Sequence, residues 1–162
     1  MDTIPVTPRT TILLRISAAL WLVWGAVHLF AGVITMARDT DDAVAGIADA
    51  VDPDTLEMDY PDAVGAVVNQ HGFNLAWIGI VTIVCSVVIW RWRAAWAVFL
   101  AAIVGGLADV GYFVFLDLGD FVNFVPGTLM TLFSASAIIT SFTAYFTTRS
   151  TTTPAPTPVD VG

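Results

Sequence analysis

The sequence predicts an all-α integral membrane protein in which four transmembrane helices form one bundle. Hydrophobic residues make up 57% of the 162-residue chain and charged residues only 12%, a composition suited to lipid. A span needs about 20 apolar residues, and backbone groups in hydrocarbon must pair within the helix. The apolar runs are continuous rather than alternating, which argues against a transmembrane barrel. The predicted spans are residues 16–36, 73–90, 94–116 and 121–146.

The first span is expected to remain in the mature protein, behind a short cytoplasmic N-terminus of residues 1–10. Its apolar run is longer than that of a usual signal peptide, and no small-residue cleavage site follows Met36. The transmembrane domain therefore covers residues 11–146 as one unit. Residues 147–162 are rich in Thr and Pro and are predicted to be a disordered cytoplasmic tail.

The arginines predict the orientation of the bundle, because the chain contains no lysine. Cytoplasmic loops of membrane proteins carry an excess of positive residues. The arginines that would share one side are Arg9, Arg15, Arg91, Arg93 and Arg149. Only Arg38 falls on the other side. We therefore expect a multi-pass protein of the plasma membrane, with both termini in the cytoplasm and the loop of residues 38–72 outside.

This outer loop carries most of the negative charge. It holds nine of the fourteen acidic residues, namely Asp39, Asp41, Asp42, Asp49, Asp52, Asp54, Glu57, Asp59 and Asp62. Such a surface repels nucleic acid and attracts cations or a basic partner. A short helix is predicted over residues 41–51, and Pro61 favours a start of the second helix near Asp62.

Small residues mark the expected packing faces. In the first span Gly25, His28 and Gly32 follow Trp21 at helical spacing, so the four positions share one face. Glycine at such positions lets a second helix approach closely. The third span has a similar series that leads to an acidic residue: Ala102, Gly105, Gly106 and Asp109.

Two further residues of the spans have structural interpretations. Cys85 has no possible disulfide partner and is predicted to be a small buried hydrophobic residue. Pro126 is expected in the first turns of the fourth helix, where proline disturbs the helix little.

Two ionisable side chains are predicted at matching depth in parallel spans. His28 lies about 12 Å from the outer end of its span and Asp109 about 10 Å from the outer end of its own, at 1.5 Å per residue. A carboxylate inside a bilayer is costly unless it is neutralised, paired or hydrated. We therefore expect a hydrogen bond between His28 and Asp109, which would also fix the tautomer of the imidazole.

The candidate ligand-binding residues all fall in the outer half of the bundle: His28, His71, Asn74, Asp109, Tyr112 and Asn123. Together they predict a small polar pocket that opens outward. Such a pocket could bind a small ligand, or it could belong to an accessory subunit of a larger membrane complex. No catalytic residue is predicted, because Cys85 and Ser86 lie far from either histidine.

Two other functions stay open at this point. His28, His71 and Asp109 could ligate a metal, since two histidines and a carboxylate bind non-haem iron, or the histidines could ligate haem in a redox subunit. The depths of His28 and His71 differ by about 10 Å, which disfavours haem between them, so no cofactor is expected. A transporter or channel would require a homo-oligomer, because four short helices make a thin pathway and the inner half lacks charge.

Overall fold

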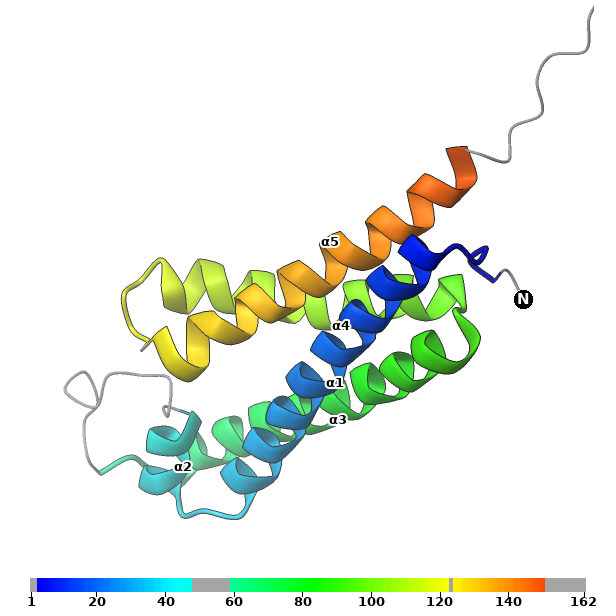
Figure 1. Cartoon of the computed structure of the whole chain (residues 1–162). Coiled ribbons are helices and arrows are strands. Elements are labelled where there is room, and N and C mark those ends of the chain that lie inside the picture. Colours follow the sequence, from blue (N-terminus) through cyan, green and yellow to red (C-terminus); the bar gives the residue numbers. More distant parts are fainter. Residues whose placement is uncertain (1–2, 48–58, 123, 151–162) are drawn as a thin grey trace, which may run out of the picture.

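The structure, a computed structural model, describes residues 3–47, 59–122 and 124–150 (Figure 1). Within these ranges all the named elements are helices: α1 (Pro8–Met36), α2 (Thr40–Ile47), α3 (Asp62–Trp92), α4 (Ala95–Tyr112) and α5 (Leu129–Ser150). Two short π-helical segments lie between α4 and α5, namely η2 (Phe113–Asp117) and η3 (Phe124–Thr128).

Four helical stretches are long and apolar enough to cross a membrane. They are Pro8–Met36, Asp62–Trp92, Ala95–Asp117 and Phe124–Thr148. This confirms the predicted all-α class and its long apolar helices in the described part of the chain. Helices α1 and α3 begin several residues before the predicted apolar spans, at Pro8 and Asp62. At the first helix, Thr7 and Thr10 form a reciprocal capping box and Pro8 occupies the first turn.

The long helices form a ring in which α1 and α4 lie on one diagonal. Helix α1 packs along α3 and α5, and α4 packs along the same two helices. Figure 1 shows α2 and the link between α4 and α5 at one end of the bundle, which we call the α2 end. The opposite end holds the start of α1, and the amide of Ile4 donates to the Arg93 carbonyl of the α3–α4 link at 3.0 Å.

Glycines of the first span bring the backbones of α1 and α3 into contact. A methyl group on Gly25 would lie 2.8 Å from the Gly79 carbonyl oxygen. One on Gly32 would collide with the Gly72 carbonyl oxygen and lie 2.6 Å from the Ala76 amide nitrogen. The glycine face of the first span is therefore a packing face against α3.

The structure adjusts the predicted element boundaries. Helix α3 begins at Asp62, close to the predicted start, and α2 covers the described part of the predicted 41–51 helix, whose residues 48–51 lie outside the described ranges. Helix α5 continues past residue 146 to Ser150, with the Thr147 hydroxyl donating to the Thr143 carbonyl at 2.6 Å. Of the predicted tail, residues 151–162 lie outside the described residues.

The expectation that Pro126 leaves the fourth helix undisturbed is wrong. Val125, which precedes it, has an extended backbone with φ −117° and ψ 125°, and α5 begins only at Leu129. The physical reason is that the proline ring disfavours the helical conformation of the preceding residue. The fourth span therefore starts with a kinked segment.

The core lies toward the arginine-bearing end of the bundle. Its largest fully buried side chains include Trp21, Trp24 and Leu14 of α1, with Ile89 of α3 and Val98 of α4. Cys85 is 1% exposed and belongs to this cluster, as predicted.

Two serines join the helices across the core. The Ser17 hydroxyl donates to the Ala137 carbonyl at 2.9 Å, and the Ser86 hydroxyl donates to the Ala18 carbonyl at 2.7 Å. Such interhelical hydrogen bonds hold membrane helices together where the hydrophobic effect does not.

Candidate ligand-binding pocket

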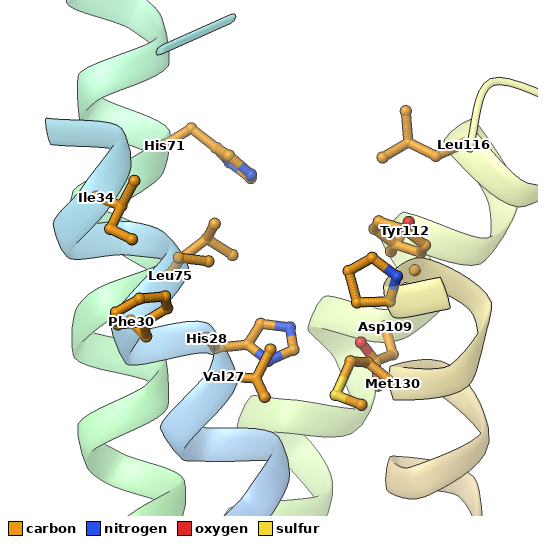
Figure 2. Close-up of a pocket in the computed structure, with 13 residues that line it drawn as sticks. Val27, His28, Phe30, Ile34, His71, Leu75, Asp109, Tyr112, Leu116 and Met130 are labelled. Carbon is orange, nitrogen blue, oxygen red and sulfur yellow. The ribbon is translucent and has the colours of Figure 1, made fainter. Parts of the chain in front are cut away.

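A cavity of about 310 Å³ lies between the helices at the α2 end (Figure 2). Its wall is mainly apolar, with four residues that carry polar side chains. The lining residues are Val27, His28, Phe30, Ala31, Ile34, His71, Leu75, Asp109, Tyr112, Leu116, Pro126, Gly127 and Met130. Figure 2 shows His28 and Asp109 facing each other low in the pocket, with His71 and Leu116 on opposite sides higher up.

Asp109 is held in the pocket by an indole from the diagonal helix. Its side chain is only 5% exposed, and its Oδ2 atom accepts a hydrogen bond from Trp24 Nε1 at 2.8 Å. The glycines before Asp109 make this reach possible, because the ring of Trp21 packs directly against Gly105. Helix α1 can thus lie close enough to α4 for an indole to span the bundle.

His28 is oriented by the same tryptophan. Its Nδ1 atom lies 2.8 Å from the Trp24 carbonyl oxygen, and the two rings stack with centroids 3.6 Å apart and planes 20° from parallel. A carbonyl oxygen can only accept, so Nδ1 must carry the hydrogen. In the neutral imidazole the remaining nitrogen, Nε2, is therefore a hydrogen-bond acceptor.

The hydrogen bond expected between His28 and Asp109 is not formed. Asp109 instead accepts from Trp24, and His28 bonds to a backbone carbonyl one turn before it on α1. The matched depth of the two residues does bring them to one cavity. Trp24 satisfies both of them, because its ring N–H faces α4 while its carbonyl faces the His28 side chain.

Tyr112 adds a hydroxyl with unused hydrogen-bonding capacity. It lines the pocket one turn from Asp109, and its buried oxygen has no hydrogen-bond partner among the described residues. Asp117 lies nearer the end of the bundle, where its Oδ1 accepts from the Thr128 hydroxyl at 2.6 Å. Its buried Oδ2 also lacks a partner within the described ranges. The described part of this region therefore contains acceptors that no donor satisfies.

The other predicted site residues are placed differently. His71 is exposed and belongs to the wall of the pocket. Asn74 does not line the cavity and accepts a hydrogen bond from Trp77 Nε1 at 3.1 Å. Asn123 lies outside the described residues. The structure thus brings together His28, His71, Asp109 and Tyr112, and whether they bind a ligand stays a prediction.

The metal alternative finds no geometric support. In the described ranges, no three or more His, Cys, Asp or Glu side chains are grouped closely enough to hold a metal ion. His28, His71 and Asp109 therefore share a cavity without forming a ligand set.

Trp24 is the residue of the candidate site that the sequence did not indicate. It precedes His28 by one helical turn, so both project from the same side of α1. A buried tryptophan usually finds a partner for its indole N–H, and a membrane acid is an obvious acceptor. Those two signals together could have identified it.

Comparison with known proteins adds no family assignment. No family model matches the chain, and no curated protein and no solved structure was found to match it.

Proposed function

We propose that the protein binds a small, mainly apolar molecule with a polar head group in the pocket at the α2 end. The observation that carries this proposal is the composition of the cavity. About 310 Å³ of space is lined mainly by apolar side chains, with His28 and Asp109 facing each other low in the pocket and Tyr112 above Asp109. Ligand pockets typically combine volumes of about 300–1,000 Å³ with apolar walls and a few convergent polar groups.

The proposed orientation places this pocket on the outer side of the plasma membrane. The start of α1 and the α3–α4 link meet at the opposite end, where Arg15 lies over the Trp90 ring at 5.5 Å. Arginine beside tryptophan is typical of a cytoplasmic membrane interface. With both termini in the cytoplasm, a ligand would enter from the outer leaflet or the external solution.

The protein would act as a binding subunit and not as an enzyme. It could work alone in the bilayer, as a homo-oligomer or inside a larger membrane complex. Transport remains the less supported alternative, because the pocket lies at one end while bulky buried side chains fill the middle of the bundle. A pathway would therefore need an oligomer.

A pocket-filling substitution tests the binding function. Ala31 lines the cavity, so Ala31→Leu should occupy space that the ligand needs. Ala26 lies on the exposed side of the same helix, and Ala26→Leu is the matched control. Purified protein would be titrated with phenylbutanol and with phenylbutylammonium, two small amphipathic probes of similar shape.

A ligand that binds the folded state raises the unfolding temperature. We expect at least one of the two probes to raise the melting temperature of the wild type and of Ala26→Leu. The same probe should have no effect on Ala31→Leu. If neither probe stabilises the wild type, or if Ala31→Leu responds like its control, the pocket is not the binding site.

A further inference from the structure

The polar part of the pocket is rich in hydrogen-bond acceptors. The Trp24 indole N–H is already donated to Asp109, and the Nδ1 hydrogen of His28 is donated to a carbonyl. What remains for a ligand is the Asp109 carboxylate, the Nε2 acceptor of His28 and the Tyr112 hydroxyl, which can donate or accept. A head group that donates several hydrogen bonds fits this set better than one that only accepts.

Asp109 also lacks a cationic partner. The chain has no lysine, and no arginine lines the pocket in the part of the chain that the structure describes. The groups that hydrogen-bond to its carboxylate, the Trp24 indole and the Ser134 hydroxyl, are both neutral. Ionised groups inside a membrane are normally paired. A positively charged ligand would therefore supply the cationic partner that the protein does not provide for Asp109.

The charges around the α2 end would attract such a ligand. Helix α2 has Asp41 and Asp42 in its first turn, and α3 begins with Asp62. A cluster of negative charge raises the local concentration of cations and speeds their association.

We infer that the ligand is a lipophilic ammonium ion, a primary or secondary amine on a small apolar body. Its N–H groups would donate to Asp109 and to His28 Nε2, while Phe30, Leu75 and Met130 enclose the body. This inference rests on the proposed binding function. A neutral ligand that offers only carbonyl oxygens would leave the acceptors at the bottom of the pocket unsatisfied.

The test compares phenylbutylammonium with phenylbutanol at neutral pH, using the full chain in nanodiscs of zwitterionic lipid. Empty nanodiscs correct for partition of each probe into lipid. We expect the wild type to bind the ammonium at least about tenfold more tightly than the alcohol, which corresponds to 1.4 kcal/mol. Asp109→Asn should lose this preference and keep its affinity for the alcohol.

Asp120→Asn is the matched control, because it removes the same charge at the same end without touching the pocket. It should retain the preference for the ammonium. The comparison of the two probes on the wild type needs no variant, so the inference stays testable even if Asp109→Asn does not fold.

The outcomes separate the two proposals. Equal affinity of the wild type for the two probes would overturn the ammonium inference and leave the binding function intact. A preference that survives in Asp109→Asn would show that Asp109 does not hold the charge. Failure of both probes to bind would overturn both proposals.

Discussion

Trp24 connects the two ionisable residues that define the pocket. It donates to Asp109 from its indole and accepts from His28 at its backbone, while its ring stacks on the imidazole. A single aromatic residue thus sets the positions of an acid on α4 and a histidine on α1. The arrangement makes the orientation of the pocket depend on a side chain that does not line it.

Replacing this tryptophan should destabilise the bundle through the buried acid. Trp24→Phe keeps a ring over His28 but removes the indole donor from the buried carboxylate of Asp109, at a cost of about 1–3 kcal/mol. The cost should fall in an Asp109→Leu background, because no acceptor is then stranded. Reversible unfolding of the four proteins in detergent would give the coupling energy, which we expect at about 0.6–1.7 kcal/mol.

Trp21→Phe is the control for this cycle. The Trp21 indole nitrogen is buried and has no hydrogen-bond partner among the described residues. Its removal should cost packing alone and should add independently to Asp109→Leu. Additive losses for Trp24 and Asp109, within about 0.3–0.5 kcal/mol, would instead show that their hydrogen bond contributes little to stability.

At the scale of single residues, the sequence located the polar cluster but not its bonds. Depth along each span follows from counting residues, so His28 and Asp109 could be placed together. Their partners depend on the rotation of each helix and on ring orientation, which counting does not determine. In the structure Asp109 accepts its hydrogen bond from the indole of Trp24 and not from His28. The sequence analysis did not count the tryptophan N–H among the polar groups of the bundle.

At the scale of elements, the glycines of α1 decide how closely α3 can pack. Gly32→Ala would push a methyl group against the backbone of Gly72 and Ala76, and backbone cannot move aside as a flexible side chain can. We expect a loss of about 1–3 kcal/mol, the usual range for overpacking. Thermal unfolding of the purified variant would measure it.

Gly111→Ala provides the comparison on α4. A methyl group there would meet no atom within 4 Å, and alanine is the better helix former. Its unfolding temperature should be unchanged or slightly higher than that of the wild type. If both substitutions were equally harmless, the close contact between α1 and α3 would not exist in the folded protein.

The packing faces could be predicted because glycine at helical spacing has few other uses in a span. The start of α5 could not be predicted in the same way. Proline is compatible with the first turn of a helix, and only the three-dimensional path of the chain shows that Val125 is extended. Local rules thus allow two solutions at that point, a helical first turn or an extended residue before the proline.

For the whole molecule, the distribution of charge predicts the side of the membrane that each end faces. In a Cys85→Ala background, Asp120→Cys should react with an impermeant maleimide in intact cells. Val6→Cys, which is exposed next to the start of α1, should react only after permeabilisation. Labelling of position 6 in intact cells would reverse the proposed orientation. The long apolar helices were predictable because the bilayer imposes both their length and their secondary structure.

The contact between α1 and α3 also determines which part of the protein can move to admit a ligand. Because the backbones of α1 and α3 are in contact, the two helices cannot move closer together, and this pair forms a fixed wall of the pocket. The opposite wall is built from the end of α4 and from η3, where an extended residue interrupts the helical hydrogen bonding. We therefore expect any widening of the entrance to come from movement of the end of α4 and of η3, while α1 and α3 keep their spacing.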